Sequence, residues 1–388
     1  MAHYLDHAAT TPMVDVAAEA LAAHAGLVGN PSASHAGGRR ARAVVDDARE
    51  RVAAAVGAHP SEVIWTSGGT EADNLAIKGL YWARRQADAR RTRIVISAVE
   101  HHAVLEPAEW LAAEHGAQLV LLPVDAHGRV DLDAVKNELA AHAESTALIS
   151  VMWANNEVGT VQPVAEVAAL AAAHGVPFHT DAVQAVGHVP VDFAHSGATA
   201  LSLSAHKVGG PVGVGALVVT RTERLMPVTH GGGQERQIRS GTLDAAGFAA
   251  TAAALDWAVD HLEGEAARLR ELQAHAVERI LATIPDAALT GTGLGPGRLP
   301  GNVHVCFPGA DPDALMFMLD SQGILASNGA ACSAGVHQSS HVLMAMGYSA
   351  ADASSTMRFS LGHTTTSGDI DALMGALPEA VERARRIR

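Results

Sequence analysis

Between residues 62 and 220, short β-rich runs alternate with longer segments of helical periodicity, and this alternation constrains the fold more than any other feature. Two parallel strands need a crossover connection, usually a helix, so the pattern predicts an α/β fold with a mainly parallel sheet and helices on both faces. The seven predicted strands cover residues 62–66, 93–97, 118–122, 148–153, 176–180, 200–204 and 213–220. A short glycine-rich stretch separates the last two, which favours a hairpin-like ending.

Helical patterns surround these strands and then continue beyond the sheet. They cover residues 14–26, 39–56, 70–87, 104–115, 132–142 and 164–174. One long helical region, 244–284, is expected to link a large α/β domain, residues 14–255, to a smaller α+β domain, residues 256–388. The smaller domain has strand patterns at 302–307, 324–327 and 357–360 and helical patterns at 312–322, 339–346 and 367–385. Residues 1–13 are expected to pack with the smaller domain.

Composition and charge exclude several classes of protein. The chain of 388 residues is 48% hydrophobic and 18% charged, which excludes a disordered chain. Its formal net charge of -14 argues against direct nucleic-acid binding. No apolar run reaches the roughly 18 residues of a membrane span, and the start lacks a secretory-signal pattern. The two cysteines, Cys306 and Cys332, cannot form a disulfide framework, so we expect a cytoplasmic location.

Polar groups gather where predicted strands end. Residues 67–70, Ser-Gly-Gly-Thr, lie between a strand and a helix, where free backbone N–H groups can hold a phosphate or form an ordinary helix cap. Asp181 follows the strand at 176–180 and can pair with a protonated ring nitrogen or cap a helix. Gln184, about one helical turn later, is a candidate hydrogen-bond donor to a ring oxygen.

Only three lysines occur in the chain, and only one of them follows a predicted strand. Lys78 and Lys136 lie on predicted amphipathic helices, whereas Lys207 follows the strand at 200–204 and precedes a glycine-rich turn. A lysine there can form a Schiff base with an aldehyde or lie on a solvent-exposed loop. A phosphate cradle, a carboxylate and a lysine together are what pyridoxal phosphate needs, so the three segments predict that cofactor.

Several longer runs then carry a resemblance that covers the chain from Tyr4 to about His363. They are YLDHAATTP, NPSASHAGGRRAR, TSGGTEADNLAIKG, EHHAVLE, MWANNEVGTVQP, HTDAVQAVG, SAHK, HGGGQER, RSGT, ACSAG and RFSLG. In combination they resemble the cysteine desulfurases, fold-type I pyridoxal phosphate enzymes of the class V aminotransferase group. The resemblance implies conversion of L-cysteine to L-alanine, with sulfur passed to an active-site cysteine as a persulfide for iron–sulfur cluster assembly and other thiolation pathways.

The same resemblance implies a role for individual residues. Lys207 would hold the cofactor aldehyde, His101 would stack on the ring and assist proton movement, and Cys332 would accept the sulfur. Further cofactor contacts are implied for Gly69, Thr70, Asn155, Asp181, Gln184, Ser204 and His206, and for Thr242 of the neighbouring subunit of a homodimer. Asn155 and Arg358 would bind the substrate carboxylate.

The sequence around Cys332, Cys306 and Arg358 leaves other roles open. Cys332 lies in a segment of small residues, which suits a reactive thiol, although a buried inert cysteine is the alternative. Cys306 lies in an alternating apolar strand pattern and is predicted to be structural. Arg358 in an apolar strand needs an anion, which a substrate carboxylate or a structural ion pair would supply. The sequence has no spacing of residues typical of a metal site. The one metal-related role predicted for it is transient ligation of an iron–sulfur cluster by Cys332.

The segment from Cys332 to Arg358 is as long as in the housekeeping iron–sulfur-cluster branch of the family, which implies an iron–sulfur scaffold or another sulfur acceptor as partner. His7 and Asp73 stand where many relatives of the family carry asparagine, and Val212 stands where a GPKG sequence is common. Two other enzyme activities, selenocysteine lyase and class V aminotransferase, are alternatives. A non-enzymatic sulfur carrier or scaffold subunit is disfavoured, because it would have no need of Lys207 and Arg358.

Overall fold

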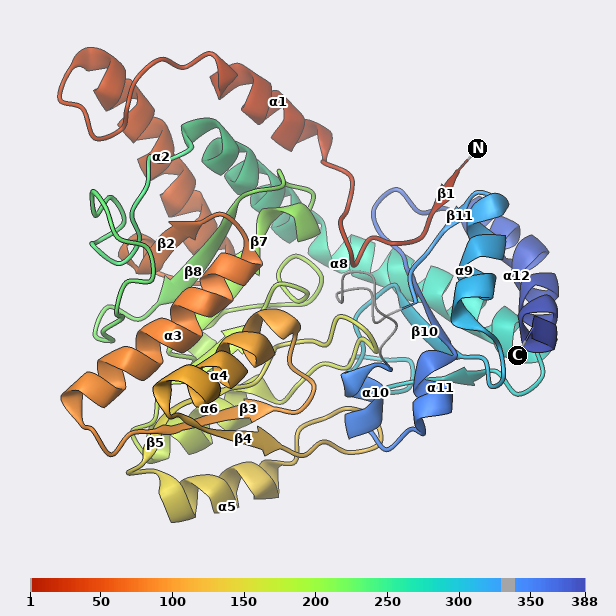
Figure 1. Ribbon diagram of the computed structural model, residues 1–388. Coiled ribbons are helices and arrows are strands. Elements are labelled where there is room, and N and C mark those ends of the chain that lie inside the picture. The colour runs from red at the N-terminus through yellow and green to blue at the C-terminus, as the bar shows by residue number, and fades with distance from the viewer. Residues whose placement is uncertain (1, 329–338, 388) are drawn as a thin grey trace.

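The computed structural model describes residues 2–328 and 339–387, and a mixed sheet forms its larger part (Figure 1). In the described chain this sheet has seven strands in the order β2-β8-β7-β6-β5-β3-β4. Their bounds are β2 Val63–Thr66, β3 Arg93–Ser97, β4 Gln118–Leu122, β5 Thr146–Ser150, β6 Phe178–Asp181, β7 Ala200–Ser204 and β8 Gly215–Val219. All the predicted strands of the sheet are confirmed, with ends shifted by a few residues. The hairpin-like ending is also confirmed, because β8 pairs antiparallel with β7.

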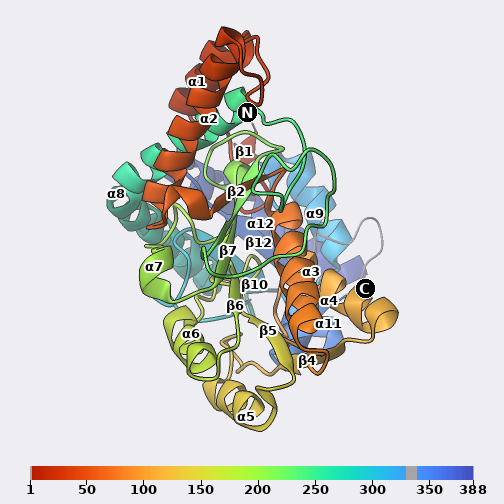
Figure 2. The same cartoon turned by 90° about the vertical axis from the view of Figure 1, so that its left-hand side faces the viewer.

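Alternating side chains along the strands place apolar residues on both faces of the sheet. On β2, Val63 and Trp65 belong to one buried cluster and Ile64 to the other. Helices α3 (Gly69–Ala87) and α4 (His102–His115) cover the Ile64 face. The Trp65 face is covered by α2 (Ala36–Ala55), α5 (Leu132–His142), α6 (Val164–Ala173), the short α7 (Phe193–Ser196) and the first part of α8 (Ala245–Thr283). Figure 2 shows α3 on one side of the strands and α6 with α7 on the other.

A second group of elements lies beyond the sheet, at the right in Figure 1. Its antiparallel strands are β9 (Ala288–Leu289), β10 (Asn302–Cys306) and β12 (Thr356–Ser360), while β1 (His3–Tyr4) pairs in parallel with β11 (Ile324–Leu325). The helices here are α9 (Pro312–Ser321), α10 (His341–Ala345), α11 (Ala350–Ser354) and α12 (Ser367–Ile387). Strands β1 and β9 were not predicted, because two residues show no period by themselves. Strand β11 is equally short, but it was predicted within the longer pattern 324–327.

Helix α8 connects the two groups, and α1 (Asp15–Ala25) packs against its first part. Leu255 on α8 belongs to the buried cluster beneath the sheet, whereas Leu269 on the same helix belongs to the cluster of the C-terminal elements. Leu5 also belongs to the second cluster, and the packing of residues 1–13 as a whole with the smaller domain stays a prediction. The division into domains after residue 255 stays a prediction. No helix among the described residues is long and apolar enough to cross a membrane.

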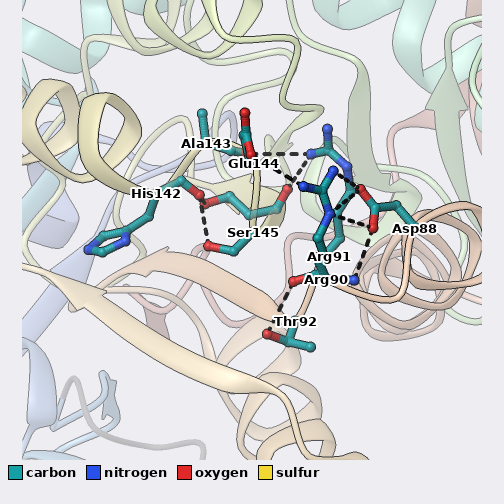
Figure 3. A network of polar contacts seen from close by, with 9 residues as sticks. Asp88, Arg90, Arg91, Thr92, His142, Ala143, Glu144 and Ser145 are labelled. Carbon is teal, nitrogen blue, oxygen red and sulfur yellow. Dashed lines mark hydrogen bonds and ion pairs between the residues drawn. The ribbon is translucent and has the colours of Figure 1, made fainter.

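Polar contacts hold the turn that precedes β3 against the end of α5 (Figure 3). Arg90 forms salt bridges with Asp88 at 2.9 Å and with Glu144 at 3.4 Å. Arg91 donates hydrogen bonds to the carbonyl oxygens of Ala143 and Thr146, at 3.3 and 2.7 Å. Because Arg90 is exposed, each of its ion pairs contributes little to stability. The network lies at the amino end of β3, opposite the carboxyl ends of the strands, where α/β sheets bind ligands.

Replacing Trp65 tests the core beneath the sheet. Its indole is fully buried and stacks on Phe248 of α8, with 4.0 Å between ring centroids. We expect Trp65→Ala to lower the free energy of unfolding by about 3–5 kcal/mol in urea denaturation, because it leaves a large cavity. Trp65→Phe should cost less, since the indole nitrogen lacks a hydrogen-bond partner among the described residues. The control is Trp110→Ala on α4, which is 41% exposed; equal losses for the two alanine variants would contradict this account.

Candidate active site

A cavity of about 250 Å³ lies at the carboxyl ends of β6 and β7. Most of the predicted site residues line it, namely Gly69, Thr70, His101, Asp181, Gln184, Ser204, His206, Lys207 and Arg358. The other described residues in its wall are Ala8, Ala9, Asp73, Met152, Asn156 and Val183. The cavity thus collects side chains from α3, from the residues after β3, β6 and β7, and from β12, together with the N-terminal segment.

Lys207 lies at the end of a single 3-10 turn that follows β7. Its ammonium group donates hydrogen bonds to the carbonyl oxygens of Ala8 at 2.6 Å and Ala9 at 2.8 Å. The side-chain amide of Gln184 donates to the same Ala8 oxygen at 2.9 Å. The N-terminal segment therefore supplies a backbone surface that fixes both side chains, and Lys207 is half-buried in the cavity wall rather than exposed on a loop.

Asp181 is the last residue of β6, and only 4% of it is exposed. One carboxylate oxygen accepts a hydrogen bond from the backbone N–H of Val183 at 2.9 Å. Burial raises the pKa of Asp181 to about 6, although that hydrogen bond and the charge of Lys207 act in the opposite direction. The group is therefore ionised at neutral pH, and its negative charge suits a cationic ring nitrogen in the cavity.

The glycine-rich turn before α3 forms a compact anion cradle. Gly68 has a φ of 151°, which glycine adopts more readily than other residues. A Cβ on Gly69 would lie 2.7 Å from a methyl carbon of Val183, so a side chain would fill this space. Nearby, the buried hydroxyl of Ser204 has no hydrogen-bond partner among the described residues. With Thr70 at the helix N-terminus, these groups fit the phosphate of pyridoxal phosphate.

Two histidines in the cavity wall are neutral. Burial lowers the pKa of His101 to about 4, and Lys207 is the next cause. The Nδ1 atom of His101 accepts a hydrogen bond from Ala103 N–H at the start of α4, so the proton of the neutral ring is on Nε2. Burial also lowers the pKa of His206 to about 4, and its Nδ1 lies 3.1 Å from the Thr10 hydroxyl. Both rings can thus act as neutral hydrogen-bonding groups.

Arg358 forms the structural ion pair that the sequence left open, and its role toward a substrate carboxylate stays a prediction. It lies on β12, is 3% exposed and forms an ion pair with Asp6 at 2.9 Å. A second guanidinium nitrogen donates to the carbonyl oxygen of Asn156 at 2.9 Å. The buried Nε has no hydrogen-bond partner among the described residues, and the side chain lines the cavity. The ion pair orients the guanidinium, which still presents positive charge to an anion in the cavity.

Two predicted residues, Asn155 and Thr242, are not among the described residues that line this cavity. The Asn155 amide donates to Val99 and its oxygen accepts from the N–H groups of Glu157 and Val158, so Asn156 is the described asparagine at the wall. Thr242 is exposed, and it is not among the described residues that line the cavity. Cys332 lies outside the described residues.

Some wall groups were missed from the sequence. Asp73 shares the apolar face of α3 with Ala76 and Leu80, and a charge on such a face was the available signal. The carbonyl groups of Ala8 and Ala9 left no signal, because every residue has a carbonyl.

Comparison with known proteins finds similarity over almost the entire chain. The model of the family "Aminotransferase class-V" matches residues 3–373. An IscS-like cysteine desulfurase of Mycobacterium tuberculosis is 53% identical, covering 99% of this chain and 97% of the relative. The cysteine desulfurase IscS of Dictyoglomus turgidum is 40% identical over 99% of this chain and 95% of its own.

Solved structures agree with this assignment. A NifS-like protein superposes with a TM-score of 0.90 at 32% identity, covering 99% of this chain and 100% of that one. A structure described as SspA in complex with cysteine gives a TM-score of 0.79 at 33% identity, covering 94% of this chain and 100% of its own. The chain therefore belongs to the class V aminotransferase family, among its cysteine desulfurases, which use pyridoxal phosphate.

Proposed function

We propose that this cavity is where the chain, as a cysteine desulfurase, holds pyridoxal phosphate and L-cysteine, and that the sulfur leaves as a persulfide on Cys332. The observation that carries the proposal is the meeting of Lys207 and Asp181 at the ends of two adjacent strands, beside a glycine-rich helix start. The overall similarity to cysteine desulfurases supports the reaction, and the cysteine-bound relative supports the substrate.

Different residues of the cavity wall would hold different parts of the cofactor. Lys207 would hold the aldehyde, Asp181 the ring nitrogen and Gln184 the phenolic oxygen, with His101 against the ring. The phosphate would lie against Gly69, Thr70, Ser204 and His206. When bound, the cofactor supplies an electron sink that weakens the bonds of the substrate at the carbon beside its carboxylate. The fit is supported by the unpartnered Ser204 hydroxyl and by the space that a side chain on Gly69 would fill.

Substrate binding and proton transfer fall to other residues of the wall. Arg358 would pair with the substrate carboxylate while Asp6 keeps the guanidinium in place. Lys207 would take the proton from the α-carbon and return it, and the neutral His101 would move the thiol proton from its position at the wall. Asn155 stays a predicted contact, and the structure supports an indirect role in which it folds the turn that presents Asn156.

The sulfur would then pass to Cys332. Its thiolate would attack the substrate sulfur, so that a sulfur–sulfur bond forms while the carbon–sulfur bond breaks and its electrons stay with the carbon fragment. Protonation of that fragment yields L-alanine. Described residues on both sides of Cys332 lie near the cavity. Before it, the backbone of Ser327 pairs with Arg358, and after it the Ser340 hydroxyl donates to Glu157 at 2.6 Å.

We also propose that the protein works as a cytoplasmic homodimer that passes sulfur to an iron–sulfur scaffold or another acceptor. Thr242 would reach the cofactor phosphate of the neighbouring subunit, which its exposed position supports. Arg239, three residues earlier, pairs with Glu71 of the first turn of α3 at 2.8 Å. The loop that carries Thr242 is thereby tied to the helix whose start forms the anion cradle.

Replacing the lysine tests its role. We expect Lys207→Ala to reduce kcat for alanine release from L-cysteine by about 10²–10⁴-fold, because the variant lacks both the anchor of the cofactor and the base. The absorption spectrum of the bound cofactor should lose the band of its Schiff base with the lysine. Lys136→Ala is the control, since this exposed lysine lies on α5. Equal activity of the two variants would refute the assignment.

Intact-mass spectrometry tests the sulfur acceptor. After incubation with L-cysteine, the wild-type protein should gain the mass of sulfur, and Cys332→Ala should gain none while still binding the cofactor. The matched control is Cys306→Ala, because Cys306 is 2% exposed and burial raises its thiol pKa to about 11, which disfavours the reactive thiolate. Persulfide on the Cys332→Ala protein would contradict the proposal.

The pH dependence of cofactor binding tests Asp181. The raised pKa of about 6 means that this carboxyl gains a proton as the pH falls through that value, and the neutral acid no longer attracts a cationic ring. We expect the dissociation constant of pyridoxal phosphate, measured by equilibrium dialysis, to rise between pH 7 and pH 5. Asp181→Asn should bind weakly throughout and show no such transition. A transition of the same size in the variant would assign it to another group.

A further inference from the structure

Asp73 lies in the second turn of α3 and faces the sheet beside the cavity. Only 1% of the residue is exposed, and its Oδ1 has no hydrogen-bond partner among the described residues. Oδ1 lies 3.5 Å from Nε2 of His179, which is also fully buried. The mechanism proposed above gives this carboxyl group no task, although it lies in the same wall as Asp181.

Too many acidic groups are buried here for all of them to be charged. Asp73, Asp181 and Glu100 interact electrostatically, and Glu100 is 1% exposed with one oxygen unpartnered among the described residues. Like charges in a buried site oppose each other, so each carboxylate needs a cation or must keep its proton. Lys207 is the cation that acts on Asp181, whereas the charged groups found to act on Asp73 are the carboxyls Asp181 and Glu100.

The neighbouring histidines do not supply the missing charge. The two ring nitrogens of His179 lie 2.9 Å from the Ser150 hydroxyl and 3.0 Å from the Ser202 hydroxyl. Burial lowers the pKa of His179 to about 3, and it lowers that of His101 to about 4, so both rings are neutral. Arg358 is paired with Asp6. Burial and the Asp181 charge together raise the pKa of Asp73 well above its usual range, although a hydrogen bond with Ser202 acts against them.

We propose that Asp73 is a positioning residue that keeps its proton at neutral pH, so that Asp181 is the carboxylate that meets the cofactor ring. A protonated carboxyl has nearly the shape of an amide and can donate as well as accept a hydrogen bond. Asp73 then acts through Asp181, because it occupies the same cavity wall without adding a second negative charge. The inference rests on the proposed function in one respect, the contact between Asp181 and the ring.

Infrared difference spectroscopy of the full-length, cofactor-loaded protein at pH 7.5 tests the protonation state. We expect the wild-type spectrum to contain a carbonyl band of a protonated carboxylic acid that is absent from Asp73→Asn. Glu106→Gln is the control, since the Glu106 side chain on α4 is 71% exposed. Bands of other buried acids, such as Glu100 whose pKa burial also raises, are common to both proteins and cancel in the difference spectrum. An acid band of equal intensity in the two proteins would overturn the proposal, and so would a wild-type spectrum without such a band.

The pH dependence of stability provides a second readout. An acid whose pKa is raised in the folded state keeps a proton that the unfolded chain has released, so stability is lost as the pH rises above the unfolded value of 3.8. The urea midpoint of the wild type should therefore fall relative to that of Asp73→Asn between pH 5 and pH 8. A constant difference over this range would contradict the inference.

If Asp73→Asn does not fold, Asp73→Ser allows the same two measurements, because it also removes the acid. Neither measurement uses L-cysteine or turnover. A chain that failed as a desulfurase could still show the protonated Asp73, and an active desulfurase could still lack it, so the two failures are distinguishable.

Discussion

The site depends on one half-buried contact, in which the ammonium group of Lys207 is held by the carbonyl oxygens of Ala8 and Ala9. A lysine in a largely buried cavity needs hydrogen-bond acceptors and a nearby negative charge. The carbonyl groups supply the acceptors, and Asp181 supplies the charge. Because Lys207 donates its hydrogen bonds to neutral carbonyl groups, it does not need the Asp181 carboxylate as a hydrogen-bond acceptor. The Asp181 charge therefore stays available for a cationic ligand.

The N-terminal segment can supply these acceptors because β12 holds it in place. The backbone N–H of His7 donates to the Ser360 carbonyl at 3.2 Å, and that of Ala8 donates to the Ser360 hydroxyl at 2.9 Å. His7 is itself buried, with Nδ1 2.6 Å from the Thr11 hydroxyl. The segment thus lies between β12 and the lysine turn after β7, and the cavity depends on both groups of elements.

The sequence predicted the sheet well because its strands carry their own signal. Val63 and Trp65 face one helical layer and Ile64 the other, and this pattern repeats in strands that alternate with helices. The positions of Asp181 and Lys207 followed from the strand ends. Asn155 was predicted at the site, whereas its neighbour Asn156 is the asparagine that lines the cavity, because the Asn155 side chain bonds to the turn. Two identical adjacent side chains give no sequence signal for this difference. The carbonyl groups of Ala8 and Ala9 could not be predicted, because a backbone acceptor leaves no trace in residue identity.

The pairing of Asp6 to Ala8 with Ser360 joins the first part of the chain to nearly the last. During synthesis the sheet can form as its strands emerge, but the wall of the cavity must wait for β12, more than 350 residues after the segment that it holds. Contacts between such distant parts of a chain form late, because the intervening loop must close first. Ala8 and Ala9 are synthesised before the lysine turn, but they are held against it only once β12 has formed, so the complete binding pocket exists only after that strand is in place.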